Sequence, residues 1–258
     1  MPAPSPSAQP GGPGLTLVGV GPGDPDLLTV AAVKAIEAAA VVAYPVAREG
    51  AEGMAAAIAA PWIGAGQRRL PLLFPMVAEV EPRIAAWHAA ADALATEVAA
   101  GHAVVLLCEG DVSLFASSSY VLMALRQRHP HCPLRLIPGI PSACAAAAAA
   151  SSQGLAWPLA LQQEGLLVRP TPDAAAELEL LLDRSAQDGT VLALLKLGRR
   201  WPWVRPLLEA RGLLESSLLA QRVGWPDQRL ALASAVPAVE QAYFSLLLVR
   251  QGWPAVLP

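Results

Sequence analysis

Short, almost continuously apolar segments alternate with helical patterns through the first half of this sequence. The apolar segments occupy residues 15–20, 41–44, 103–108 and 134–137. Strands that are buried on both faces read as continuous apolar runs, and parallel strands need a long crossover that is usually a helix. The alternation therefore predicts an α/β fold in which helices cover both faces of a parallel sheet.

Local signals mark the ends of several of these elements. Thr29 is a predicted N-cap, because its hydroxyl can accept from the first free amides of a helix at 30–39. The other elements predicted in this half are helices at 54–60, 82–100 and 117–128 and an extended segment at 69–75. Gly101 fits the position after a helix, and Pro45 is predicted to end the second strand.

The pattern changes after Ile140, which indicates a second region. Helices are predicted there at 141–151 and 203–211, and strands at 190–195, 218–223, 230–233 and 243–249. We therefore predict two α/β domains, residues 15–139 and 140–254. A tail at 1–14, rich in Pro, Ser and Gly, is expected to be disordered.

Composition excludes several classes of protein. The chain of 258 residues has a formal net charge of −3, which does not favour binding to nucleic acid. It contains no apolar run of about 18 residues, so we expect no membrane span. The three cysteines form no C-x-x-C pair, and the one close pair of histidines, His129 and His131, has no carboxylate beside it and only the single thiol of Cys132. We therefore expect a cytoplasmic protein without a metal site.

The stretch "LVGVGPGDPDLLT" after the first apolar run looks at first like a nucleotide-binding turn. Its glycines, Gly19, Gly21 and Gly23, lack the G-x-G-x-x-G spacing, since Asp24 stands at the third position, and no Walker A lysine follows. Pro22 and a second proline at position 25 also remove two backbone donors that a phosphate would need. Taken alone, the stretch predicts a tight turn between a strand and a helix, and a role in a larger ligand site stays open.

Two further turns follow apolar runs in the same way. In "CEGDV", Glu109 and Asp111 flank Gly110, and "IPGIPS" ends with Ser142. Parallel sheets bind ligands at the carboxyl ends of their strands. The three turns are therefore expected to form one cleft.

Together, "VGVGPGDPDLLT", "CEGDV" with "SLFAS", and "IPGIPS" resemble the signatures of the tetrapyrrole methyltransferases of cobalamin and sirohaem synthesis. The resemblance runs from Leu15 to Val249. It implies the tetrapyrrole methylase fold, with two α/β domains and an active-site cleft between them. It also implies S-adenosyl-L-methionine as the methyl donor, a tetrapyrrole substrate and a homodimer.

Other stretches narrow the resemblance to one branch of the family. "VVAYPVAREG", "LPLLFPM" and "YFSLLLV" are similar to enzymes that methylate carbon 20 of precorrin-2. Methylases acting at C4, C11 or C17 are the alternative, as is a non-catalytic relative that binds the cofactor or a tetrapyrrole. Val112 and Pro141 depart from the family pattern, where Pro and Ser or Thr are usual.

The resemblance also assigns site residues. It places six residues near the cofactor: Pro22, Gly110, Asp111, Val112, Ser142 and Lys196. Lys196 is alternatively a lysine that reaches solvent from the end of a buried strand. Methyl transfer to carbon 20 must be followed by loss of a proton, for which Glu109 and Asp111 are the candidate acceptors. Either carboxylate can instead bind the cofactor or cap a turn.

Substrate contacts are expected after the second strand. Precorrin-2 carries several carboxylates, which arginine binds well. Arg48, in "YPVAREG", lies at the correct edge of the predicted sheet and is a candidate substrate ligand, with a solvated loop charge as the alternative. Tyr44 is expected either to line the cleft or to pack in the core.

Overall fold

The computed structural model describes residues 11–253 of the chain, so most of the predicted tail, residues 1–10, lies outside the described residues. The chain divides into two compact units, Met1–Pro141 and Ser142–Pro258. The first strand begins at Gly14, just inside the predicted tail. Among residues 11–253, no helix is both long enough and apolar enough to cross a membrane.

The first unit is built on a five-stranded parallel sheet. Its strands are β1 (Gly14–Gly19), β2 (Val41–Val46), β3 (Arg68–Leu73), β4 (Ala103–Cys108) and β5 (Leu134–Ile137). They lie in the order β3-β2-β4-β1-β5, and every neighbouring pair is parallel. The parallel sheet predicted from the apolar runs is confirmed. The strands β4, β1 and β5 are adjacent, which brings together the three turns that follow them.

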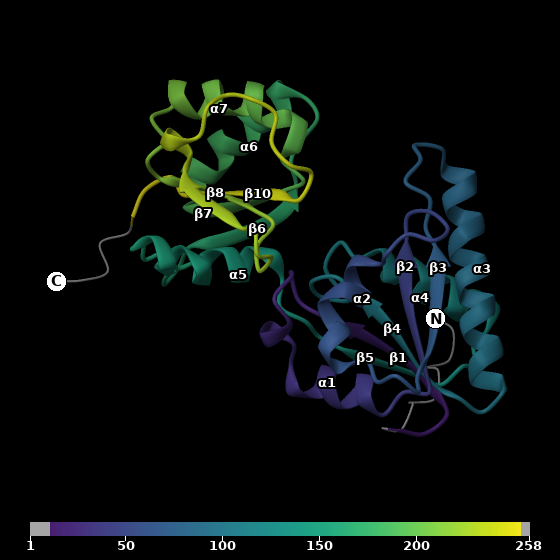
Figure 1. Ribbon diagram of the computed structural model, residues 1–258. Helices are drawn as coiled ribbons and strands as arrows, with labels where there is room; N and C mark the ends of the chain where they lie inside the picture. The colour runs from purple at the N-terminus through teal and green to yellow at the C-terminus, as the bar shows by residue number, and fades with distance from the viewer. Residues whose placement is uncertain (1–10, 254–258) are drawn as a thin grey trace. The chain divides into compact units, whose positions relative to one another are not determined.

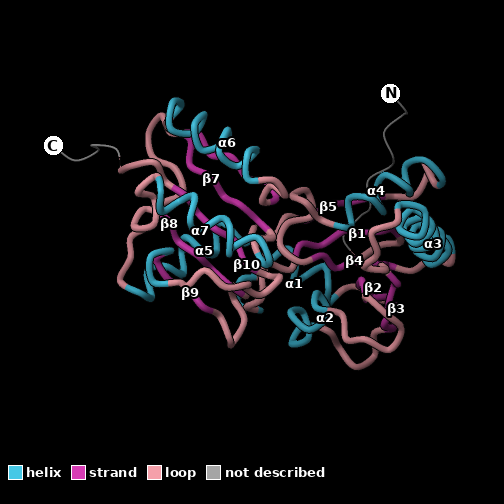
Figure 2. The backbone as a smooth tube through the Cα atoms, turned by 90° about the horizontal axis from the view of Figure 1, so that it is seen from above, coloured by secondary structure: helices cyan, strands magenta, loops and turns pink. Residues whose placement is uncertain are grey.

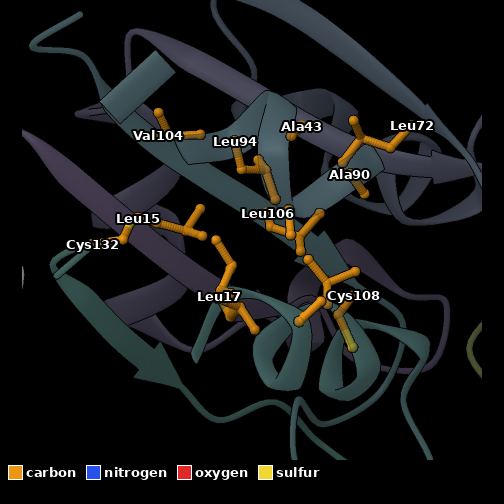
Figure 3. Close-up of a cluster of buried hydrophobic side chains, with 14 of the residues drawn as sticks. Leu15, Leu17, Ala43, Leu72, Ala90, Leu94, Val104, Leu106, Cys108 and Cys132 are labelled. Carbon is orange, nitrogen blue, oxygen red and sulfur yellow. The ribbon is translucent and has the colours of Figure 1, made fainter. Parts of the chain in front are cut away.

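Helices cover both faces of this sheet. They are α1 (Val30–Glu37), α2 (Met54–Ala59), α3 (Val80–Ala99) and α4 (Ser117–Arg128). Figure 1 shows α3 on one side of the sheet and α1 on the other. Figure 3 shows the hydrophobic core of this unit, in which Leu94 of α3 belongs to the same buried cluster as Leu15 and Leu106 of the sheet. Thr29 caps α1 as predicted, because its Oγ1 accepts from the amide of Ala32 at 3.1 Å.

Proline 45 does not end the second strand, so that prediction is wrong. β2 continues through Pro45 to Val46, pairing with β3 along its whole length. Its pairing with β4 stops at Ala43. The missing amide of Pro45 therefore removes no hydrogen bond from the β2–β4 ladder, and the strand tolerates the proline.

The second unit contains a mixed sheet. Its strands are β6 (Gly165–Pro170), β7 (Thr190–Leu195), β8 (Ser217–Gln221), β9 (Arg229–Leu232) and β10 (Ser245–Val249). Their order is β6-β7-β10-β8-β9; β6 and β7 are parallel, and the other neighbours are antiparallel. Figure 2 shows the strands of this unit from above, and β10 is hydrogen-bonded to both β7 and β8. Since β7 and β8 are both antiparallel to β10, their carboxyl ends reach the same edge of the sheet.

The α-helices described in this unit are α5 (Ser142–Ala149), α6 (Ala175–Asp188) and α7 (Trp201–Ala210). Figure 1 shows α6 and α7 on one side of the sheet and α5 on the other. Neither β6 nor α6 is among the elements predicted from the sequence. The signal for α6 is present, since Leu178, Leu181 and Leu182 have helical spacing and are buried. Helix α7 begins at Trp201, two residues before the predicted start. Trp201 is fully buried, and the indole nitrogen of its side chain donates a hydrogen bond to the carbonyl of Pro237 at 2.8 Å.

Candidate active site

The first two turns meet at the carboxyl edge of the parallel sheet. Gly21, after β1, and Gly110, after β4, form an antiparallel bridge. The amide of Gly21 donates to the carbonyl of Gly110 at 3.2 Å, and the amide of Gly110 donates back at 2.8 Å. Both glycines have positive φ, +75° and +67°, which favours glycine. The two turns are thus one hydrogen-bonded unit, as the prediction of a shared site requires.

The third turn, after β5, packs against the first two through its backbone. A Cβ added at Gly139 would lie 2.9 Å from the Cα of Gly19, and one added at Gly19 would lie 2.5 Å from the nitrogen of Gly139. Real Cβ atoms essentially never come this close to other atoms. Glycine is therefore required at both positions by contact between the turns. This contact, rather than a phosphate, explains Gly19 in "VGVGPG".

Asp111 ties the second turn to the third. Its Oδ2 accepts from the amide of Gly139 at 2.9 Å, and its Oδ1 accepts from the amide of Ser113 at 2.9 Å. The hydroxyl of Ser113 also donates to Oδ1. Burial alone would raise the pKa of Asp111, but these hydrogen bonds outweigh it and lower the pKa. Asp111 is therefore an ionised, fully engaged carboxylate.

Glu109 is in a different situation, although it lies only two residues away. Its side chain is partly buried, and no hydrogen bond or ion pair engages its carboxylate within residues 11–253. Its backbone carbonyl accepts from the Sγ of Cys108 at 3.3 Å. Burial raises the pKa of the Glu109 carboxyl. Such a group has unused hydrogen-bonding capacity and a stronger tendency to take up a proton.

The other cofactor candidates of this unit have distinct surroundings. Gly110 has open space where a Cβ would stand, with no atom within 4 Å. Pro22, in the first turn, is partly buried. Val112 is only 4% exposed, belongs to the hydrophobic core, and its carbonyl accepts from the hydroxyl of Ser119 at 3.0 Å. The side chain of Val112 is thus used for packing, which leaves its backbone as the part that can face a ligand.

Of the two substrate candidates, Tyr44 lies within β2, the strand next to β4, and Arg48 lies just after it. Arg48 is exposed in the turn after β2, at the same edge of the sheet as Glu109. Tyr44 is partly buried within β2, and its ring lies against Gly53, where an added Cβ would be 3.0 Å from Cε2. The structure therefore brings Arg48 to the predicted edge and gives Tyr44 a packing role.

Lys196 and Ser142 belong to the second unit. Lys196 is exposed directly after β7, and its φ of +56° is unusual for a residue with a side chain. Its carbonyl accepts from Nη1 of Arg200 at 2.8 Å. Strained backbone of this kind often occurs at functional sites. Ser142 is the first residue of α5 and is partly buried.

A family model described as "Tetrapyrrole (Corrin/Porphyrin) Methylases" matches residues 14–235. The chain belongs to this family. A precorrin-2 C(20)-methyltransferase from Sinorhizobium is 34% identical to this methylase over 92% of the chain and 94% of the relative. A cobalt-precorrin-2 C(20)-methyltransferase from Salmonella typhimurium is 30% identical over 93% of the chain and 97% of the relative.

The fold of this methylase is also found among solved structures. Uroporphyrin-III C-methyl transferase from Thermus thermophilus, complexed with S-adenyl homocysteine, superimposes with a TM-score of 0.57. The match covers 92% of this chain and 96% of the other at 23% identity, which establishes likeness of fold. The predicted family and fold class are confirmed.

Sequence reasoning on this methylase missed two residues that shape the site. Within residues 11–253, Gly139 and Ser113 supply the hydrogen bonds that the Asp111 side chain accepts, yet neither was among the predicted site residues. Gly139 lies within "IPGIPS", where glycine between two prolines signals a restricted turn. Nothing in the sequence signals the partnership of Ser113 with Asp111 beyond the two-residue spacing typical of an Asx turn.

Proposed function

We propose that this protein transfers a methyl group from S-adenosyl-L-methionine to carbon 20 of precorrin-2, or of its cobalt complex, in cobalamin biosynthesis. The proposal rests chiefly on the two C(20)-methyltransferases that align with the chain over nearly their full lengths. The distinctive "AYP" and "FPM" stretches lie in β2 and just after β3. Methylation at C4, C11 or C17 and a non-catalytic binding role are the alternatives.

The residues at the strand ends of the first unit fit this methyl donor. When bound, S-adenosyl-L-methionine supplies an activated methyl group on a positively charged sulfur. The turns at 19–29, 109–119 and 138–142 contain no Lys or Arg, while Glu109 and Asp111 are acidic. Such turns suit a cationic ligand better than a phosphate. Gly110 also leaves open space in which a ligand can approach the backbone.

Each predicted residue has a role in this proposal. Six residues hold the cofactor, largely through their backbone: Pro22, Gly110, Asp111, Val112, Ser142 and Lys196. Arg48, exposed beyond β2, binds a carboxylate of the tetrapyrrole, and Tyr44 supports that turn by packing. The site thereby aligns donor and acceptor, and proximity accounts for much of the rate enhancement. The cleft between the two domains stays a prediction.

We extend the proposal to a cytoplasmic homodimer. The family resemblance supports the dimer, and the free thiols of Cys108, Cys132 and Cys144 suit a reducing compartment. Sedimentation analysis of the purified protein is expected to give twice the mass of the chain. A monomer at micromolar concentration would contradict the proposed dimer but would not bear on the proposed reaction.

An anaerobic assay tests the proposed reaction. Calorimetry is expected to detect binding of S-adenosyl-L-methionine, and turnover with metal-free and cobalt-bound precorrin-2 should then identify the preferred substrate. Binding without transfer to any precorrin would favour the non-catalytic alternative. Transfer to C4, C11 or C17 of a later precorrin would favour another branch of the family.

A further inference from the structure

We propose that Glu109 is the catalytic residue that accepts the proton released from carbon 20, and that Asp111 is a positioning residue. This assignment rests on the proposed function. The sequence leaves the two carboxylates equivalent, since both flank Gly110 at the end of β4. The hydrogen bonds in the structure distinguish the two carboxylates.

The reaction requires a proton acceptor. As the bond between carbon 20 and the methyl carbon forms, the C–S bond breaks and its electron pair stays on sulfur, giving S-adenosylhomocysteine. Carbon 20 then carries both the methyl group and its original hydrogen, and the macrocycle has gained one positive charge. Transfer of that hydrogen as a proton to Glu109 returns the C–H electron pair to the conjugated ring. Solvent later removes the proton from the carboxyl group.

Asp111 is poorly suited to this step. Both of its oxygens accept hydrogen bonds, one from the amide of Gly139 and the other from Ser113. Taking up a proton would weaken these bonds and loosen the contact between the second and third turns. Its pKa is lowered by the same bonds, which makes it a weaker base.

Glu109 has the properties that Asp111 lacks. It follows the central strand β4 directly, beside the bridge between Gly21 and Gly110, and no group within residues 11–253 engages its carboxylate. Its charged neighbour is Asp111, and the adjacent Cys108 thiol stays neutral because burial raises its pKa to about 11. Burial likewise raises the pKa of Glu109, toward the range in which a general base works best at neutral pH.

The variant Glu109→Gln tests the assignment. It keeps the size of the side chain and removes the base, so kcat is expected to fall by about 100-fold or more. Binding of S-adenosylhomocysteine, measured by calorimetry, is expected to be unchanged. The wild-type enzyme should lose activity at acid pH as Glu109 becomes protonated, and this acid limb should be absent from the residual activity of the variant. Precorrin-2 deuterated at carbon 20 should react with a larger isotope effect in the variant, because proton loss becomes limiting.

Two further variants serve as controls. Glu109→Asp keeps a carboxylate and should keep the acid limb, while Glu179→Gln, on the exposed face of α6, should behave as wild type. Wild-type kcat with an unchanged acid limb in Glu109→Gln would overturn the assignment, as would a slow variant whose isotope effect equals that of wild type. A wild-type protein that does not methylate carbon 20 would overturn the proposed function, and the assignment with it.

Discussion

The two units hold their loops in different ways. In the first unit, the turns after β1, β4 and β5 touch through their backbones, which is why Gly19 and Gly139 cannot carry side chains. The Asp111 carboxylate adds side-chain hydrogen bonds to this backbone contact. In the second unit, a buried ion pair holds the segment that precedes β6. The guanidinium of Arg250, 1% exposed at the end of β10, pairs with Glu164 and donates to the carbonyl of Pro158 at 2.6 Å. Backbone contacts tolerate few substitutions but need no charge, whereas a buried ion pair fails when either partner is lost.

The largest effect on stability is expected from Arg250→Ala. It leaves the Glu164 carboxylate, 12% exposed, without its partner, and breaking a buried pair typically costs about 3–5 kcal/mol. Denaturant unfolding should show this loss in the second unit. As a control, Arg211→Ala removes the pair with Asp183, whose side chain is 52% exposed, and should change the free energy of unfolding by less than about 1 kcal/mol. Equal losses in the two variants would contradict the comparison.

Gly139→Ala is expected to destabilise the first unit. The added Cβ would lie 2.8 Å from the carbonyl carbon of Gly19, and overpacking of this kind costs about 1–3 kcal/mol or more. The same unit offers a matched control in Gly66→Ala, since no atom lies within 4 Å of a Cβ there and φ is not positive. A melting temperature that falls equally in both variants would show that the turns do not touch.

A pH-dependent effect of similar size is expected from Asp111→Asn. An amide cannot accept from all three donors around Asp111, and hydrogen bonds to charged groups contribute about 1.5–3 kcal/mol. The pKa of Asp111 is lowered in the folded state, so its carboxylate stabilises the protein above the unfolded-state pKa. That contribution is lost as pH falls through the folded-state pKa. Chemical unfolding at neutral and acid pH should therefore show a difference from wild type that shrinks on acidification.

Glu109→Gln is expected to have the smallest effect on stability, and of opposite sign. The pKa of Glu109 is raised in the folded state, so its ionisation destabilises the protein as pH rises from the unfolded-state pKa through the folded-state pKa. The variant should consequently be slightly more stable than wild type at neutral pH and equal to it at acid pH. A loss of stability at neutral pH would mean that the carboxylate has a structural partner.

The same contrast explains how much of the fold the sequence could predict. The parallel sheet was predictable because its strands are continuous apolar runs separated by helices, and Thr29 and Gly101 mark helix ends. Strand β6 is partly exposed, and its apolar run is only three residues long, from Leu166 to Val168, which makes its signal weaker. The pairing of Arg250 with Glu164 joins residues 86 positions apart, and no local pattern predicts it.

The candidate site shows a similar limit. The positions of Glu109, Gly110 and Asp111 follow from the turn at the end of an apolar strand. The different roles of the two carboxylates depend on the amide of Gly139, which is 28 positions from Asp111. Such a contact becomes visible only once β4 and β5 are placed on either side of β1. Sequence reasoning could therefore name both acids but could not separate them.

The most direct test of the proposed function is the location of the transferred methyl group. The protein is incubated anaerobically with precorrin-2 and S-adenosyl-L-methionine labelled with ¹³C in its methyl group, and the product is examined by NMR. We predict one new labelled methyl group bonded to carbon 20. A labelled methyl group on any other carbon, or none at all, would contradict the account.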